Sequence, residues 1–147
     1  MGAVRYLLDT SILSHLIRFP RGNAAERIRG VGESAVATSV VVACELRYGV
    51  RKKGSPALTE RVDALLDAID VLPLGPGVDV EYGRIRNHLE ARGTPIGAND
   101  LLIAAHALAE GLTLVTDNVE EFSRVPDLRI ENWLRTLGRW DVRTVGR

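Results

Sequence analysis

Short apolar runs alternate with amphipathic stretches along the chain, and this pattern predicts strands that alternate with helices. The apolar runs predict strands at 4–8, 35–38, 71–74, 112–116 and 128–131. The amphipathic stretches predict helices at 11–17, 23–29, 39–53, 57–69, 78–92 and 98–110. Such an alternation is typical of a parallel sheet with helices on both faces. The predicted fold class is therefore α/β.

The sequence predicts a single domain. A length of 147 residues suits a single core, and no internal repeat or low-complexity linker divides the sequence. Patterning is weak after residue 137. We therefore expect one domain over 1–137 and a mobile C-terminal tail at 138–147.

Two acidic residues directly follow predicted strands. Asp9 comes after Tyr6–Leu8, and Asp117 comes after the run that ends at Thr116. Open α/β sheets place their sites at the carboxyl ends of their strands. The alternative for each residue is local, since Asp9 can cap the next helix and Asp117 can form a turn with Asn118.

Two further acidic residues fall on apolar faces of predicted helices. At about 100° per residue, Glu45 shares a face with Val41, Val42, Tyr48 and Gly49. Asp100 shares a face with Ile103, Ala104 and Ala107. A buried carboxylate needs a salt bridge, a raised pKa or a metal. The structural alternatives are a paired core glutamate and a first-turn aspartate favoured by the helix dipole.

Four carboxylates brought together would repel one another unless a cation lay between them. Ligation by oxygen alone favours Mg²⁺ or Mn²⁺ over zinc, and the single Cys44 excludes a cysteine-cluster zinc site. A divalent cation can activate water for attack on phosphorus. Metal-dependent hydrolysis of a phosphoester is therefore the chemical hypothesis that the acids favour.

The charge balance changes its meaning under this hypothesis. The 19 basic and 19 acidic residues give a net charge of zero, which argues against a nucleic-acid partner. If four acids bind metal, 15 remain against 19 bases, and all of these bases except Lys52 and Lys53 are arginines, which suit phosphate. One helix end carries Arg47, Arg51, Lys52 and Lys53. Either the positive charges of this cluster are stabilised at the helix C-terminus by the helix dipole, or they contact the RNA backbone.

Four sequence blocks, in this order, resemble the PIN-domain nucleases, and specifically the VapC toxins of bacterial toxin–antitoxin pairs. The blocks are Tyr6–Ser11, Ser39–Gly49 with its ELRYG segment, Gly97–Ala107, and Val115–Asn118 with Phe122. The resemblance spans about Val4 to Trp133. Each block is weak alone, whereas four in order with matching gaps are specific.

The resemblance implies a three-layer α/β/α sandwich with a short central parallel sheet and an acidic pocket that binds Mg²⁺ or Mn²⁺. The catalytic and metal-binding positions that it implies are Asp9, Glu45, Asp100 and Asp117. The supporting positions that it implies are Thr10, Thr116 and Asn118. It also implies a ribonuclease acting on structured RNA such as tRNA or rRNA. The implied partners are a second copy of the chain and a VapB-type antitoxin that inserts a segment into the active-site groove.

Three other interpretations of these acids can be compared with the sequence, and only one of them remains. A haloacid-dehalogenase-type enzyme needs an aspartate two residues after Asp9, where Ser11 stands. A response-regulator receiver domain needs a lysine after a late strand, but the lysines are Lys52 and Lys53. The alternative that remains is a PIN-like module that binds RNA or protein without cutting.

The remaining residues of interest are expected to be structural. The three histidines, His15, His88 and His106, show no pairing along their helices, and Cys44 is expected in the core. Trp133 and Trp140 are expected to pack the end of the sheet or a dimer surface. No apolar run approaches the roughly 18 residues of a membrane span, and Asp9 comes too early for a signal peptide. The expected location is the cytoplasm.

Overall fold

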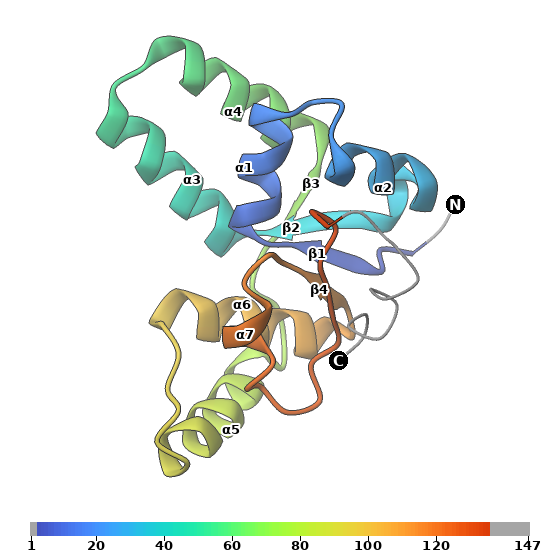
Figure 1. The fold of residues 1–147 in the computed structure, drawn as a ribbon. Coiled ribbons are helices and arrows are strands. Elements are labelled where there is room, and N and C mark those ends of the chain that lie inside the picture. Colours follow the sequence, from blue (N-terminus) through green and yellow to red (C-terminus); the bar gives the residue numbers. More distant parts are fainter. Residues whose placement is uncertain (1–2, 136–147) are drawn as a thin grey trace.

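The computed structural model of the chain describes residues 3–135 and has a five-stranded parallel sheet at its centre (Figure 1). The strands are β1 (Tyr6–Leu8), β2 (Val36–Ser39), β3 (Asp70–Leu72), β4 (Thr113–Val115) and β5 (Ile130–Glu131). Their order across the sheet is β3-β2-β1-β4-β5, and every neighbouring pair is parallel. The predicted parallel sheet is confirmed.

Helices cover both faces of this sheet. They are α1 (Thr10–Arg18), α2 (Asn23–Val31), α3 (Val40–Lys53), α4 (Pro56–Ala68), α5 (Val78–Ala91), α6 (Ala98–Glu110) and α7 (Val119–Phe122), with a 3₁₀ turn η1 (Glu33–Ala35). Figure 1 shows α1 to α4 on one side of the sheet and the packed pair of α5 and α6 on the other. This arrangement confirms the three-layer α/β/α sandwich.

The short strands form because their side chains are buried on both faces. Leu7, Leu8, Leu114 and Val115 are fully buried, and so is Ala37 of β2. For this reason the central strands of a parallel sheet appear in the sequence as continuous apolar runs. The core therefore lies on the two faces of β1, β2 and β4.

Local capping sets the bounds of α3 and α4. The Ser39 hydroxyl accepts the backbone N–H of Val41 at 3.1 Å, as the sequence predicts, and Gly54 ends α3 in the left-handed conformation with φ of 66°. Ser55 then caps α4, and Pro56 occupies its first turn. Consequently the helix that carries Glu45 starts directly at the end of β2.

Several local expectations are corrected. Gly22 rather than Asn23 caps α2, because the Asn23 amide donates to the carbonyl of Leu134 at 2.9 Å. The expectation that Cys44 lies in the core is wrong, since it is exposed on α3. The short helix α7 has no counterpart among the predicted elements.

The other outcomes concern the C-terminal part. Trp133 is fully buried and packs edge-on against Tyr6 with ring centroids 5.0 Å apart, so it closes the end of the sheet. Trp140 and the predicted tail at 138–147 lie outside the described residues. Among the described helices, none has the length and apolar character that crossing a bilayer requires.

Candidate active site

The carboxyl ends of β1 and β4 meet at the point where the chain changes direction across the sheet. From β1 the chain continues to β2 on one side, and β4 lies on the other side. Leu8 pairs with Val115, and the backbone N–H of Asp9 donates to the carbonyl of Val115 at 2.9 Å. Asp9 and Thr116 therefore emerge side by side at a topological switch point, where open α/β sheets bind ligands.

Asp9 is the most enclosed of the acids, with 6% of its surface exposed. One carboxylate oxygen accepts the backbone N–H of Thr10 at 2.7 Å, and the other accepts the hydroxyl of Thr116 at 2.7 Å. Burial raises the pKa of Asp9, and the charges of Glu45 and Glu121 add to this, while the two hydrogen bonds act in the opposite direction. Asp9 is thus fixed in position but surrounded by like charge.

Glu45 approaches the same place from α3. Its carboxylate accepts the hydroxyl of Thr10 through one oxygen and the amide of Asn99 at 3.2 Å through the other. The side chain is half-buried, and Tyr48, predicted on the same apolar face, is 67% exposed. Glu45 therefore lies at the border of the core, and the apolar face predicted around it does not extend to Tyr48.

Asp100 in the first turn of α6 pairs with an acid that the sequence reasoning missed, Glu121 on α7. Burial, a hydrogen bond with Glu121 and the charges of Glu121, Asp9 and Glu45 raise the pKa of Asp100 to about 7. Burial acts to raise the pKa of Glu121 as well, but hydrogen bonds from Asp100, the N–H of Gly97 and Asn118 leave it below its ordinary value. These opposite pKa directions favour a proton on Asp100 that is hydrogen-bonded to the Glu121 carboxylate.

Glu121 could have been found from its sequence neighbours. It directly precedes Phe122, which is fully buried, and it lies three residues after Asn118, whose amide donates to it. Its second carboxylate oxygen accepts the N–H of Gly97 at 3.1 Å, just before α6. An acid beside a buried aromatic residue, close to a strand end, was the available signal.

Asp117 points elsewhere. It is exposed, its N–H donates to the Ser11 hydroxyl at 3.1 Å, and its carboxylate accepts the Asn132 amide at 3.0 Å. The structure thus brings together Asp9, Glu45, Asp100 and Glu121, which we name the acid cluster. A metal-binding role for Asp117 stays a prediction.

The predicted supporting residues lie between these acids. Thr116 is fully buried, donates to Asp9 and accepts the N–H of Asn118 at 3.0 Å. Thr10 joins Asp9 to Glu45, and Asn118 joins Thr116 to Glu121. One hydrogen-bonded path therefore runs through the acid cluster.

The donor set of the acid cluster consists of oxygens. Hard divalent cations such as Mg²⁺ prefer these donors, and a cation would relieve the like-charge repulsion that adds to burial in raising the pKa of Asp9 and Asp100. Within residues 3–135, however, no group of three or more His, Cys, Asp or Glu side chains is gathered closely enough to hold a metal as it stands. The chemistry of the site fits such a cation, and binding would draw the carboxylates inwards.

The histidines take no part in the acid cluster. His106 is fully buried, its Nδ1 lies 2.8 Å from the Ser39 hydroxyl, and burial lowers its pKa. His15 packs against the Phe19 ring with centroids 4.9 Å apart. His88 is half-buried in the last turn of α5. These positions fit the structural roles expected of them.

The basic residues predicted to contact RNA are all exposed on α3. Arg51, Lys52 and Lys53 occupy its last turn, and Arg47 forms an ion pair with Asp63 of α4. Lys53 also borders a groove of about 410 Å³ whose other end reaches Thr10 and Glu45. The cationic end of α3 is therefore connected to the acid cluster along this groove.

Known proteins similar to this chain share its whole described fold. The model of the PIN domain matches residues 6–128. Ribonuclease VapC2 of Rickettsia felis is 38% identical over 130 residues, covering 87% of this chain and 97% of the relative. The tRNA(fMet)-specific endonuclease VapC of Salmonella typhimurium is 33% identical over 131 residues, covering 88% and 98%.

Solved structures agree with these matches. The chain in the crystal structure of VapBC2 from Rickettsia felis bound to a DNA fragment from their promoter has a TM-score of 0.82 at 36% identity, covering 88% of this chain and 99% of that one. A chain of DNA-bound VapBC from Salmonella typhimurium has a TM-score of 0.80 at 33% identity, covering 88% and 98%. The resemblance noted from the four sequence blocks is confirmed. The chain therefore belongs to the PIN-domain family and, within it, to the VapC ribonuclease toxins of VapBC toxin–antitoxin systems.

Proposed function

We propose that this chain is a metal-dependent endoribonuclease that hydrolyses phosphodiester bonds of structured RNA, either tRNA or rRNA. The observation that carries the proposal is the acid cluster at the carboxyl edge of β1 and β4. Burial and the like charges of the neighbouring acids raise the pKa of both Asp9 and Asp100, and perturbed pKa values of this kind cluster at functional sites, which supports the proposal. The Salmonella relative named for tRNA(fMet) supports tRNA as the substrate class.

The cofactor in this proposal is Mg²⁺ or Mn²⁺. Asp9, Glu45, Asp100 and Glu121 would hold it, with Asp117 as the further acid that the sequence singles out. When bound, such a cation stabilises charge on the phosphate oxygens and lowers the pKa of water for attack on phosphorus. The chain orients the ligands: Thr10 and Thr116 fix Asp9, and Asn99 holds Glu45.

The RNA backbone would be bound at the end of α3. Arg51, Lys52 and Lys53 present exposed positive charge, and phosphate contacts supply much of the affinity of such complexes. The exposed ion pair of Arg47 with Asp63 contributes little to stability, so Arg47 can exchange its partner for a phosphate. Substrates of this kind occur in the cytoplasm, which is therefore the proposed location of the protein.

The partner proposed to control the enzyme is a VapB-type antitoxin. The groove that connects Glu45 with Lys53 has an apolar floor formed by Leu46, Val50, Leu58 and Val62. An apolar floor of this kind fits the apolar face of an inserted helix. A segment seated there would reach Glu45 and obstruct the acid cluster, and undiminished RNA cleavage by the complex would contradict this placement.

A second copy of the chain is the other proposed partner. Cys44 and Tyr48 are exposed on α3, and with Leu102 of α6 they border an open hollow of about 570 Å³. Exposed apolar surface of this kind is typical of protein interfaces. Sedimentation of the purified chain as a monomer would contradict the homodimer.

The experiment that tests the proposed function measures RNA cleavage by the purified chain with Mg²⁺, with Mn²⁺ and with excess EDTA. We expect cleavage only with a divalent cation, and we expect Asp100→Asn to abolish it. Asp127→Asn is the matched control, because Asp127 is exposed, has φ of 68° that asparagine tolerates, and lies outside the acid cluster. Full cleavage in EDTA would contradict the proposed metal dependence of the enzyme.

The non-catalytic alternative gives a different result in the same experiment. A chain that binds Mn²⁺ and RNA but leaves total cellular RNA intact would be a PIN-like binding module. Titration calorimetry with Mn²⁺ would detect the metal in that case, and Asp100→Asn would weaken the binding without any activity to lose.

A further inference from the structure

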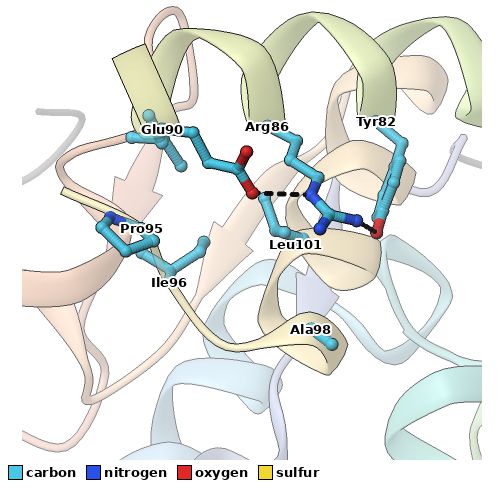
Figure 2. Close-up of a pocket in the computed structure, with 8 residues that line it drawn as sticks. Tyr82, Arg86, Glu90, Pro95, Ile96, Ala98 and Leu101 are labelled. Carbon is cyan, nitrogen blue, oxygen red and sulfur yellow. Dashed lines mark hydrogen bonds and ion pairs between the residues drawn. The ribbon is translucent and has the colours of Figure 1, made fainter. Parts of the chain in front are cut away.

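A further hollow lies between α5 and the start of α6, and none of the acids of the acid cluster lines it (Figure 2). We call it the α5–α6 pocket, with a volume of about 110 Å³. One wall is polar and comes from α5, and the floor is apolar and comes from the loop that leads into α6 and from the first turn of α6. The residues that define it are Tyr82, Arg86 and Glu90 on the wall, and Pro95, Ile96 and Leu101 on the floor.

The polar wall is a row of three side chains spaced four residues apart on α5. Arg86 donates through Nε to Glu90 at 2.9 Å and through Nη1 to the Tyr82 hydroxyl at 3.0 Å (Figure 2). Its guanidinium lies 5.9 Å from the centroid of the Tyr82 ring. The row therefore presents a planar cation, a carboxylate and an aromatic ring on one surface.

This row is accessible and weakly held. The side chains of Arg86 and Glu90 are 52% and 56% exposed. Exposed ion pairs within a helix add little to stability, because solvent screens them. Arg86 and Glu90 can therefore exchange their mutual hydrogen bond for bonds to a ligand at small cost.

The apolar floor and the small volume favour a flat ring whose faces can pack on apolar side chains. Ile96 and Leu101 are almost fully buried, and the Pro95 ring borders them. A volume of about 110 Å³ is well below the roughly 300–1,000 Å³ of sites that enclose a small molecule. A single planar ring system inserted edgewise satisfies both limits.

The pocket and the acid cluster share one segment of chain. Leu101 directly follows Asp100, and Arg124 donates to the carbonyl of Pro95 at 3.2 Å while its charge acts on Glu121. Adjacent residues of a helix differ by about 1.5 Å along its axis, so the two sites lie at the same level of α6, on neighbouring faces. A ring in the pocket would belong to a group adjacent to the one at the acids.

We propose that the α5–α6 pocket binds an unpaired guanine of the RNA substrate, one or two nucleotides from the cleaved bond. This inference rests on the proposed ribonuclease function. Unpaired RNA bases stack on aromatic or arginine planes and are read along their edges. Along its Watson–Crick edge guanine offers the acceptor O6 to Arg86 and its N1–H and amino group as donors to Glu90. Arg86 and Glu90 then determine base specificity, without a role in the hydrolysis.

The test compares Arg86→Ala with Arg84→Ala on a library of RNA loops of random sequence. Arg84 lies on the same helix and pairs with Glu81 and Asp127 outside the pocket, so both variants lose one positive charge. Sequencing of the new RNA ends reports base preference near the cut. We expect the wild type to favour guanine at one fixed position and Arg86→Ala to lower that preference about 10-fold. Arg84→Ala should retain it.

Two results would overturn the pocket assignment while the nuclease stands. One is a wild type that cuts RNA with no base preference. The other is a preference that Arg86→Ala leaves intact or that Arg84→Ala lowers equally. A wild type that cuts no RNA overturns the proposed function and the pocket with it. Glu90→Gln gives a second variant of unchanged size, and we expect it to lower guanine preference while the melting temperature stays that of the wild type.

Discussion

The two halves of the acid cluster are held in different ways. Asp9 is enclosed and receives hydrogen bonds from two neutral donors, the N–H of Thr10 and the hydroxyl of Thr116. Asp100 is half-buried, and its main partner is another acid, Glu121. The Asp9 half is thus fixed by the sheet and its neighbours, whereas the Asp100 half depends on a hydrogen bond between two acids. The proposed cation would displace the proton of that hydrogen bond, so we expect binding to change the Asp100 half most.

The largest expected effect is the loss of RNA cleavage when either half loses its carboxylate. The free energy of unfolding then distinguishes the two halves. Asp9→Asn and Asp100→Asn should each lower RNA cleavage at least about 100-fold, because each removes a carboxylate from the proposed metal site. Asp9→Asn should also cost about 1 kcal/mol of unfolding free energy, since the new amide faces the Thr116 hydroxyl in a buried place. Asp100→Asn should leave the metal-free stability unchanged or raised, because it removes a repelling charge.

Cleavage rates and thermal unfolding in EDTA would check this contrast. A destabilisation by Asp100→Asn as large as that by Asp9→Asn would show that the two halves are held alike. Asp127→Asn again serves as the control for an exposed acid.

A second effect concerns which acid completes the Asp100 half. Glu121→Gln should weaken Mn²⁺ binding about 10- to 100-fold, the range typical of residues that orient or complete a metal site. Asp117→Asn should weaken it less, because its carboxylate bonds to Asn132 at 3.0 Å outside the cluster. Calorimetric titration of the two variants measures the difference. An equal or larger loss in Asp117→Asn would assign the fourth position to the acid that the sequence predicted.

The smallest effect is the pH dependence of metal binding. The pKa of Asp100 is raised to about 7, so below that pH a proton must leave before a cation binds. Mn²⁺ affinity should therefore rise by at most about tenfold per pH unit up to about pH 7 and level off above it. Without metal the same group stabilises the fold only while protonated, so this contribution falls as the pH rises from the ordinary 3.8 toward about 7.

Calorimetric titrations from about pH 5.5 to pH 8.5 check the expected rise, with Asp100→Asn as the reference that lacks it. An affinity that is flat across this range in the wild type would contradict a proton shared between Asp100 and Glu121.

Sequence reasoning succeeded where periodicity and chain direction decide the structure. The bounds of α6 are those predicted, Ala98–Glu110, because a long apolar stripe between Gly97 and Gly111 leaves little choice. Asp9 was placed at the end of a strand, since a buried apolar run stops there. These features need only neighbouring residues.

It failed where distant residues decide. The helix α7 has four residues, which is too short for a periodic pattern, so Glu121 remained hidden within it. The sequence likewise gives no reason to place Ser11 and Asn132 beside Asp117, whose metal-binding role stays a prediction. The exposure of Cys44 and Tyr48 depends on how α3 packs on the rest of the molecule, and helical spacing alone does not determine it.

The backbone N–H of Asp9 forms the last rung of the β1–β4 ladder, on the carbonyl of Val115. We expect this amide to exchange slowly with solvent hydrogen, because it belongs to the ladder between two buried central strands. Hydrogen exchange at Asp9 would then report on opening of the central sheet, whereas a local opening around Asp100 would leave it unchanged.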